Sequence, residues 1–488
     1  MVIKLRAMFH FDSATRTEII GVLLLVVHVA GFAHALHAIM RVRTSQGAIA
    51  WAISLIVWPY IAIPAYWVLG RRKFTGYVQA RRVGRLKLNH VADEVSRNLA
   101  GFHADPSLPA REAFRAMEHL LRLPFTAGNG AELLIDGEAA FAAMIAAIDR
   151  AEKYILVQFF IVRDDRIGRD FKEALLRKAL AGVRIYYLMD IIGSHQLSHA
   201  YDRELTAAGA KVHRFGEFNR RVGRWQINFR NHRKILIVDG REAFIGGLNV
   251  GDEYLGRVKR FGPWRDTHLR LTGAAVQCIQ LSFLEDWYWA DESVPELNWM
   301  PVSAAANLPV LILPTGPAEE VEACSLFFVQ AINQAKRRLW ITSPYFVPDS
   351  SVVNALQLAA MRGVDVRILL PQKPDHILVY LSSFSYLEEM TTGGVNLFRY
   401  APGFMHQKVM LIDDDLAAVG TANLDNRSFR LNFEMTALIA DAGFARCVEE
   451  MLERDFSCAR RVGARDYTSR RLPFRLAVRV SRLLSPLQ

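Results

Sequence analysis

The sequence predicts an α/β protein in which two similar halves form one pseudo-twofold domain, preceded by two transmembrane helices. Three observations lead to this prediction. Two long apolar stretches lie near the N-terminus, the pattern H-x-K-x4-D occurs twice, and helix and strand patterns alternate in the same order around each copy. A chain of 488 residues is also too long for one ordinary domain.

The N-terminal region, residues 1–73, is predicted to be a transmembrane hairpin. Residues 18–40 and 48–69 are almost wholly apolar, and each is near the ~20 residues that a helix needs to cross a bilayer. Several Trp and Tyr residues lie near the ends of the second stretch, as in an interfacial aromatic belt. A cleaved signal peptide or a buried core hairpin is the alternative, but a signal peptide has a shorter apolar region and no second span.

Basic residues flank the hairpin on its outer sides. They are Lys4, Arg6 and Arg16 before the first span and Arg71, Arg72, Lys73, Arg81, Arg82, Arg85 and Lys87 after the second, with only Arg41 and Arg43 between the spans. The positive-inside rule therefore predicts a multi-pass protein with both termini and the large C-terminal domain in the cytoplasm. The four cysteines lack metal-ligand spacing and are typical of thiols in a reducing compartment.

The rest of the chain divides into four segments. Residues 74–125 are predicted to be a basic, membrane-proximal linker with some helix. Residues 126–305 and 306–465 form the two halves, and their alternation of helix and strand predicts mainly parallel pairing. Residues 466–488 are a basic amphipathic tail, whose arginines recur every three or four residues. An interfacial membrane helix and a helix packed on the domain fit this tail equally well.

The repeated motif predicts a strand that carries a basic site. His232 and Lys234 are two positions apart, so their side chains project to the same side. Asp239 has the opposite parity and precedes a Gly at a turn, which favours a structural role at the strand end. The second copy repeats this arrangement with His406, Lys408 and Asp413.

A histidine and a lysine on one face are half of a phosphate site. Lysine supplies positive charge for phosphate oxygens, and histidine can attack phosphorus or transfer a proton near neutral pH. If the halves meet face to face, one histidine can attack while the other protonates the leaving oxygen. We expect no metal and no other cofactor, because two lysines supply the charge that a metal would bring and the chain has no compact His/Cys cluster.

A single H-x-K on a strand is common by chance, whereas two copies with matching downstream residues are not. Gly246 and Asn249 follow His232 at the same distances at which Gly420 and Asn423 follow His406. This repeated pattern resembles the phospholipase D superfamily. With the stretches "DIIGS", "GPWRDTHLRLTG", "TSPYFVPDSS" and "GTANLDNRSFRLNFE" and the two apolar spans, the chain is most similar to the bacterial cardiolipin synthases.

The resemblance implies two phospholipase D-like halves that form one catalytic domain at the bacterial inner membrane. It implies transfer of a phosphatidyl group from one phosphatidylglycerol to another through a phosphatidyl-histidine, with release of glycerol. The implied catalytic motif residues are His232, Lys234, Asp239, His406, Lys408 and Asp413. By analogy, His232 is the nucleophile and His406 the general acid.

The resemblance also implies residues that orient or bind. Members of the superfamily place a carboxylate against each catalytic histidine; Glu434 matches this position in the second half, and Asp266 is the candidate in the first. Asn249 and Asn423 would donate to phosphate oxygens. Thr421 follows the motif glycine as a hydroxyl donor, but the first half has Gly247 there, which departs from the pattern and predicts a missing phosphate donor on one side.

The net charge of +11 predicts an anionic partner, either nucleic acid or acidic lipid. The hairpin favours phosphatidylglycerol and anionic membrane lipids over a nuclease substrate. A phospholipase D-type hydrolase remains the alternative, because water access decides between transfer and hydrolysis. A membrane-anchored lipid-binding protein without chemistry is disfavoured, since binding alone needs no nucleophile.

Overall fold

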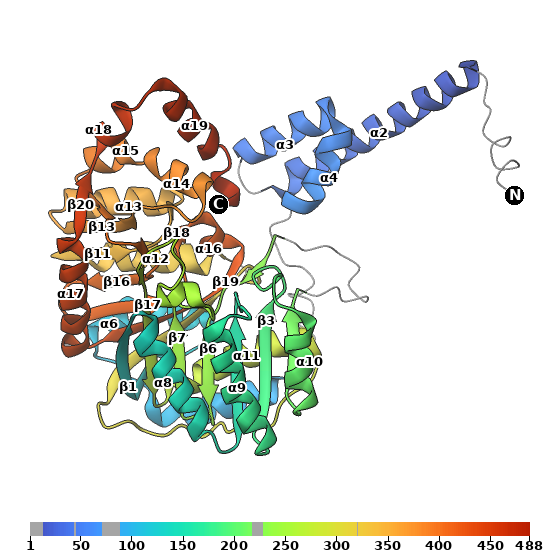
Figure 1. The fold of residues 1–488 in the computed structure, drawn as a ribbon. Coiled ribbons are helices and arrows are strands. Elements are labelled where there is room, and N and C mark those ends of the chain that lie inside the picture. Colours follow the sequence, from blue (N-terminus) through green and yellow to red (C-terminus); the bar gives the residue numbers. More distant parts are fainter. Residues whose placement is uncertain (1–12, 43–44, 71–87, 217–227, 320) are drawn as a thin grey trace, which may run out of the picture. The chain divides into compact units, whose positions relative to one another are not determined.

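A computed structural model describes residues 13–42, 45–70, 88–216, 228–319 and 321–488 (Figure 1). The chain divides into two compact units, Met1–Lys73 with Trp225–Asn228, and Phe74–Arg224 with Phe229–Gln488. Most of the basic flanking residues on which the predicted orientation rests, including Lys4, Arg6 and Arg71, lie outside the described residues.

The first unit contains three apolar helices, α2 (Ser13–Arg41), α3 (Ser45–Val57) and α4 (Pro59–Leu69). Within α2, Thr17–Arg41 is the one stretch of the described chain that is long and apolar enough to cross a membrane. The prediction of a single helix over residues 48–69 is wrong. Trp58 has non-helical angles, φ −131° and ψ 61°, and Pro59 has no N–H to continue the helical hydrogen bonds.

The helices of this unit pack through small residues. A Cβ on Gly31 of α2 would lie 2.3 Å from the Leu55 carbonyl oxygen of α3, so only glycine permits this approach. Ala35, Ala38 and Leu55 are buried in the same contact. The larger apolar side chains of α2 point outward, and Leu25 is 65% exposed. Outward-facing leucines on a long helix are typical of contact with lipid.

In the described residues, the second unit is built on one sixteen-stranded sheet and two separate pairs of short strands. The strands of the first half are β1 (Thr126–Ile135), β2 (Tyr154–Phe159), β3 (Arg184–Asp190), β4 (Lys211–Phe215), β5 (Arg230–Asn231), β6 (Ile235–Val238), β7 (Glu242–Gly246), β8 (Trp264–Arg265) and β9 (Thr267–Thr272). Those of the second half are β10 (Leu308–Thr315), β11 (Arg338–Thr342), β12 (Phe346–Val347), β13 (Asp365–Pro371), β14 (Asn396–Tyr400), β15 (Phe404–Met405), β16 (Val409–Ile412), β17 (Leu416–Gly420), β18 (Leu424–Asp425), β19 (Asn432–Ala440) and β20 (Ala459–Val462).

The strand order is pseudo-symmetric. The second half runs β14-β13-β11-β16-β17-β19-β10, and the first half continues as its mirror, β1-β9-β7-β6-β2-β3-β4. The halves join where β1 pairs antiparallel with β10, and β20 extends the edge beyond β14. The duplication inferred from the motifs is thus visible in the topology.

The expected parallel pairing holds mainly at the outer edges of the sheet. β2, β3 and β4 are parallel, as are β11, β13 and β14, and the short β5 is parallel to β19, whereas the remaining pairs of the central sheet are antiparallel. The motif strand β6 returns as β7 through the turn at Asp239–Gly240, and a short turn of this kind can join only antiparallel strands. The prediction of mainly parallel pairing is therefore wrong.

Helices cover the strands of both halves. Before the sheet and along the first half lie η2 (Ala100–Phe102), α6 (Pro109–Ala113), α7 (Arg115–Leu121), α8 (Asp136–Arg150), α9 (Arg166–Leu180), α10 (His199–Ala207), η3 (Asp252–Leu255) and α11 (Ala275–Asp291). In the second half lie α12 (Ala323–Gln334), α13 (Ser350–Met361), α14 (Ile377–Phe384), α15 (Leu387–Thr392), α16 (Asn426–Arg430), α17 (Ala442–Ser457), α18 (Ala464–Thr468), α19 (Leu472–Arg482) and η4 (Ser485–Leu487).

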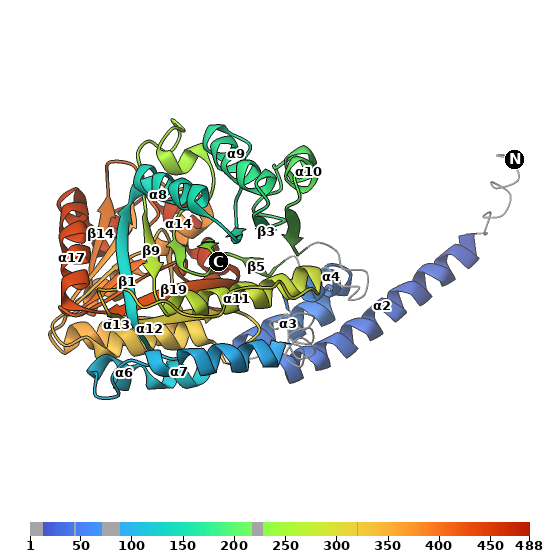
Figure 2. The same ribbon diagram turned by 90° about the horizontal axis from the view of Figure 1, so that it is seen from below.

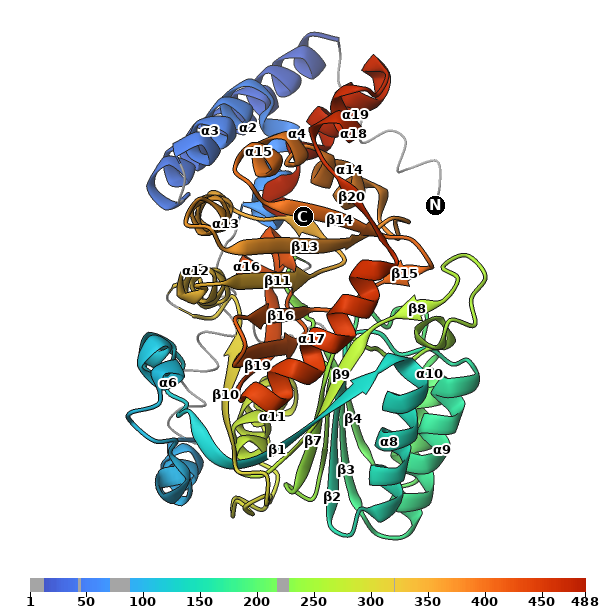
Figure 3. The same cartoon turned by 90° about the vertical axis from the view of Figure 1, so that its left-hand side faces the viewer.

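These helices create three apolar cores. One lies under α8 and α9 of the first half, a second under α12 and α13 of the second half, and a third around α11 and α17. Figures 2 and 3 show α11 and α17 between the two outer helical layers. The third core takes side chains from strands of both halves, so the halves share their interior.

The segment expected to be a linker is, where the structure describes it, part of the second unit. Residues 88–99 are helical and bury Leu88, Val91, Val95 and Leu99 in the shared core. Phe114 packs in the core of the second half. These residues therefore stabilise the second unit directly.

Candidate active site

The two histidines lie at the boundary between the halves because each motif is preceded by a short strand that pairs across that boundary. β5, just before His232, is parallel to β19 of the second half, and the His232 amide donates to the Phe433 carbonyl at 2.9 Å. β15, just before His406, is parallel to β8 of the first half, and the His406 amide donates to the Arg265 carbonyl at 2.8 Å. Each histidine is thus held by the other half.

The carboxylates also cross this boundary. His232 Nδ1 lies 2.9 Å from Glu434 Oε2, and His406 Nδ1 lies 2.8 Å from Asp266 Oδ2. The expectation that Glu434 contacts the histidine of the second half and Asp266 that of the first half is therefore wrong. Because β19 and β8 run beside the partner motif, the residues after Phe433 and Arg265 face the other half's histidine.

Each carboxylate leaves the distal nitrogen of its histidine for chemistry. A carboxylate can only accept from Nδ1, so a neutral ring carries its proton there and presents a basic Nε2. Burial lowers the pKa of His232 to about 4, and burial together with Lys408 does the same for His406. Both rings are therefore neutral near pH 7 in this structure.

The two carboxyls are ionised despite being fully buried. Burial raises the pKa of Glu434, but His232, Lys234 and the Thr421 hydroxyl together hold it below its usual value. For Asp266, His406 and Lys408 overcome burial in the same way. An ionised partner stabilises the imidazolium that forms when either ring takes up a proton.

The lysines lie beside the histidines, as the spacing predicted. Lys234 Nζ donates to the His232 carbonyl at 2.6 Å, and Lys408 Nζ lies 2.8 and 2.9 Å from the two ring nitrogens of His406. Burial holds the pKa of Lys234 well below its usual value and lowers that of Lys408 to about 8. Two lysine ammonium groups beside the histidines can bind the oxygens of an anionic ligand.

Thr421 and Gly247 differ for a reason that the sequence does not reveal. The Thr421 hydroxyl donates to Glu434 Oε2 at 2.5 Å, so it orients the carboxylate. At Gly247, a Cβ would lie 1.9 Å from Asp266 Oδ1. The glycine makes room for the shorter Asp266 side chain, which accepts instead from the Trp264 indole at 3.2 Å. The prediction of a missing phosphate donor at Gly247 finds no support in this geometry.

The two asparagines are not equivalent. Asn249 Nδ2 donates to the Tyr254 hydroxyl at 2.9 Å, and its Oδ1 accepts from the Ile161 amide at 3.1 Å. Asn423 Oδ1, in contrast, is buried without a hydrogen-bond partner among the described residues. Asn423 is therefore the better candidate for a contact with substrate, while Asn249 braces the strand ends.

The motif aspartates lie away from the histidines, at the far ends of the strands. Asp239 accepts from the amides of Glu152, Lys153 and Tyr154, each at 2.8 Å. Asp413 accepts in the same way from Lys336, Arg337 and Arg338, at distances from 2.7 to 3.1 Å. They belong to the repeated motif but cap the starts of neighbouring strands, which supports the predicted structural role without testing it.

Two buried ion pairs that sequence reasoning missed anchor the motifs. Arg233, between the first histidine and lysine, donates to Asp286 of α11 at 2.7 Å. Gln407 takes the same place in the second motif and donates to Asp455 of α17, also at 2.7 Å, while Arg265 binds that carboxylate at 2.7 and 2.9 Å. The only sequence signal was the polar residue between histidine and lysine.

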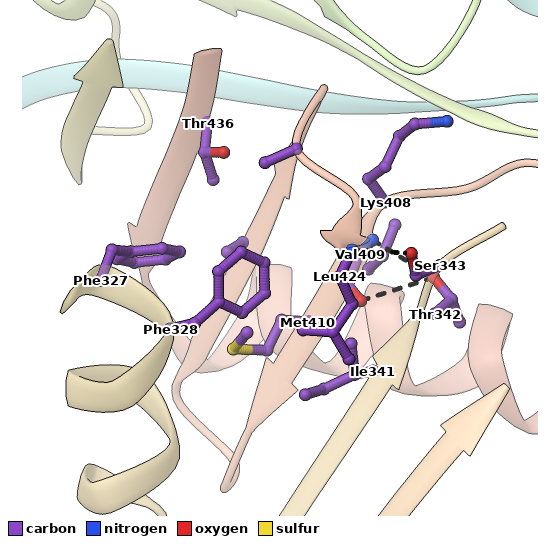
Figure 4. Close-up of a pocket in the computed structure, with 12 residues that line it drawn as sticks. Phe327, Phe328, Ile341, Thr342, Ser343, Lys408, Val409, Met410, Leu424 and Thr436 are labelled. Carbon is purple, nitrogen blue, oxygen red and sulfur yellow. Dashed lines mark hydrogen bonds between the residues drawn. The ribbon is translucent and has the colours of Figure 1, made fainter. Parts of the chain in front are cut away.

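A small cavity lies behind Lys408 (Figure 4). Its volume is about 20 Å³, enough for one water molecule, and Phe327, Phe328 and Thr436 contribute to its wall. In Figure 4 the ammonium group of Lys408 points away from the two phenyl rings. The cavity is therefore behind the lysine and does not form the substrate site.

Comparison with known proteins identifies the family. Residues 144–259 and 328–456 match the family described as "Cardiolipin synthase, PLD-like domain". The chain is 48% identical over 478 residues to cardiolipin synthase A of Pseudomonas aeruginosa, covering 97% of both chains. It is also 48% identical over 476 residues to cardiolipin synthase A of Pseudomonas putida, covering 96% of this chain and 98% of the relative.

The chain belongs to the cardiolipin synthase family. This confirms the resemblance read from the two motifs and places the protein in the phospholipase D superfamily. A solved structure of phosphatidylserine synthase from Haemophilus influenzae superimposes with a TM-score of 0.60 at 17% identity, covering 77% of this chain and 100% of that one. This likeness supports the two-half α/β fold.

Proposed function

We propose that this cardiolipin synthase family member transfers the phosphatidyl group of one phosphatidylglycerol to a second and releases glycerol. The observation that carries the proposal is the pair of crossed histidine–carboxylate contacts, His232 with Glu434 and His406 with Asp266. They provide two oriented imidazoles beside two lysines, which is what a two-step displacement at phosphorus requires.

In the first step, His232 Nε2 attacks phosphorus and the bond from phosphorus to the glycerol oxygen breaks. His406 donates a proton to that oxygen, so glycerol leaves neutral. The bound phosphodiester anion favours protonation of His406, and Asp266 stabilises the resulting imidazolium. Lys234 and Lys408 neutralise the non-bridging oxygens.

In the second step, the terminal hydroxyl of another phosphatidylglycerol attacks the phosphatidyl-histidine. Its proton passes to His406, the bond from phosphorus to His232 breaks, and cardiolipin leaves. Both histidines return to their starting protonation and bonding states, and no atom changes oxidation state, so the cycle needs no redox partner. Water in place of the second lipid would give phosphatidic acid, the product of the alternative hydrolase.

The direct test is to incubate the purified full-length protein with phosphatidylglycerol alone and identify the products. Cardiolipin with an equal amount of glycerol is expected, whereas phosphatidic acid as the main product would contradict transfer. His232→Ala and His406→Ala should both be inactive. His199→Ala is the matched control, because that side chain is 76% exposed on α10.

A phosphatidyl ester with a nitrophenolate leaving group separates the roles of the histidines. This group departs without a proton, so loss of the general acid has little effect on the first step. His406→Ala should still release a burst of nitrophenolate, whereas His232→Ala should release none. Because the carboxylates cross, Asp266→Asn should resemble His406→Ala, and Glu434→Gln should resemble His232→Ala. The reverse pattern would exchange the two roles.

We also propose that the protein is a multi-pass protein of the bacterial inner membrane with the catalytic unit in the cytoplasm. The proposal is supported by the apolar helix within α2, the additional apolar helices α3 and α4, and the basic residues that flank them in the sequence. Protease protection in spheroplasts tests the sidedness. Cleavage of the catalytic unit from outside intact spheroplasts would reverse it.

A further inference from the structure

The C-terminal helix α19 is packed on the second unit by one of its faces. Val478 is fully buried, and Ser481 is 1% exposed. The Ser481 hydroxyl donates to the Leu378 carbonyl of α14 at 2.7 Å, and the rings of Phe474 and Phe384 lie 5.3 Å apart. Figure 1 shows α19 beside α14. This face accounts for the attachment of the helix.

A second apolar face of α19 points away from the protein. Leu476 and Val480 lie two positions on either side of Val478, which places them roughly 160° around the helix from the buried face. Their exposed fractions are 62% and 54%. The other exposed apolar residues on this side of the tail are Leu472 and Leu483. We call Leu472, Leu476, Val480 and Leu483 the outer apolar face.

Arginines line the region between the buried and outer faces of α19. They are Arg471, Arg475, Arg479 and Arg482. The guanidinium groups of Arg475 and Arg479 lie over the Tyr467 ring, and that of Arg482 lies 5.0 Å from the Tyr386 ring. No acidic residue occurs in Leu472–Arg482. An apolar stripe bordered only by arginines is complementary to anionic headgroups over acyl chains.

We propose that the outer apolar face binds the surface of an anionic bilayer, as an attachment of the catalytic unit separate from the N-terminal apolar helices. The leucines would enter the headgroup–acyl boundary, and the arginines would bind lipid phosphates. A second copy of the chain fits this face less well, because pairing two such faces brings like-charged arginines together. Binding by this face does not depend on the chemistry of the active site.

The test places an environment-sensitive dye on a single cysteine of the full-length protein in liposomes. Cys447 and Cys458 are the exposed cysteines and would be changed to serine, whereas Cys278 and Cys324 are buried. The reporter is Leu476→Cys. The matched control is Leu180→Cys, because Leu180 is a leucine on α9 that is 77% exposed.

In vesicles that contain phosphatidylglycerol, we expect brominated lipids to quench the dye at position 476 severalfold more than the dye at position 180. Aqueous iodide should show the opposite preference. Arg471→Gln in the reporter background should weaken the lipid quenching. Equal quenching at the two positions, or no lipid quenching at position 476, would overturn the proposal. Protection from iodide without lipid quenching would also overturn it and indicate a second copy.

Discussion

At the scale of single residues, the site is symmetric in its reacting groups and asymmetric in what supports them. Glu434 is held by the hydroxyls of Thr421 and Ser428. Asp266 is one methylene shorter and is held by the Trp264 indole and the Thr267 amide. Each carboxylate is therefore fixed by different neighbours, although it performs the same task on its histidine.

Restoring a hydroxyl to the first half should damage the enzyme. Gly247→Ser adds a Cβ where Asp266 Oδ1 lies 1.9 Å away, so the carboxylate must move and His406 loses its partner. We expect phosphatidyl transfer to fall by about 10²-fold or more, the scale of a misplaced acid–base group. Thr421→Ser is the control, because it keeps the hydroxyl. Wild-type or higher activity in Gly247→Ser would restore the idea of a missing phosphate donor.

The lysine beside His406 should set an alkaline limit on activity. Its pKa is lowered to about 8, so Lys408 loses its proton, and the site loses a positive charge, as the pH rises through that value. We expect kcat/KM, which reports the free enzyme, to decline above about pH 8. Lys408→Arg should be less active but lack this limb, since a guanidinium stays charged. A limb that persists in the variant belongs to another group.

At the scale of elements, the repeated hairpin is the unit that delivers the chemistry. In each half the motif strand ends at an aspartate with positive φ, 54° for Asp239 and 51° for Asp413, and then turns back. The aspartate caps three amides at the start of a neighbouring strand. The hairpin is thereby fixed at the end opposite to the histidine and lysine.

The aspartates should therefore matter more for stability than for turnover. Asp239→Asn and Asp413→Asn keep a side chain that tolerates positive φ but replace one of the two acceptor oxygens that hold three amides by an amide NH₂ group, which can only donate. We expect each to lower the free energy of unfolding by about 1–3 kcal/mol, measured by denaturant titration. Asp415→Asn, an exposed neighbour of Asp413, is the control. A folded variant with wild-type stability and no turnover would show that the role is catalytic.

Hydrophobicity alone predicted these elements unevenly. The 3.6- and 2-residue periods identified the helices and strands, but β6 begins at Ile235, so His232 and Lys234 precede the strand in which the sequence pattern placed them. The apolar stretch of residues 48–69 was read as one span because its length suited a bilayer, yet Pro59 divides it. The mean hydropathy of a stretch is hardly changed by one proline, whereas a proline interrupts the backbone hydrogen bonds of a helix.

At the scale of the whole molecule, the fold class and family could be predicted because the motif H-x-K-x4-D occurs twice in the sequence. The crossing of Glu434 to His232 and of Asp266 to His406 could not. It depends on β5 pairing with β19 and on β8 pairing with β15, and two-residue strands leave no hydrophobic pattern. The partners of Arg233 and Arg265 could not be predicted either, because Asp286 and Asp455 lie on helices that are distant in the sequence.

The charge of the assembled site leads to a prediction about metals. Two lysines offset two ionised carboxylates around two neutral histidines, so the proton that His406 takes up when a phosphodiester binds supplies the charge that offsets this anion, and no metal is needed for it. Activity in detergent–lipid micelles should survive treatment with EDTA and subsequent removal of the chelator. Loss of activity that one divalent metal restores would contradict this. The His199→Ala variant should respond to EDTA as the wild type does.

The exchange of partners across the middle of the molecule has a consequence for how such a chain can change over time. Duplication usually makes one copy redundant, so that it can accumulate substitutions while the other copy keeps the original function. Here neither half is redundant. Loss of the Glu434 carboxylate removes the partner of His232 in the first half, and loss of the Asp266 carboxylate removes the partner of His406 in the second half. Neither half can lose its carboxylate without loss of function in the other. A new specificity therefore has to arise from residues around the histidines and carboxylates, where Thr421 and Gly247 already differ.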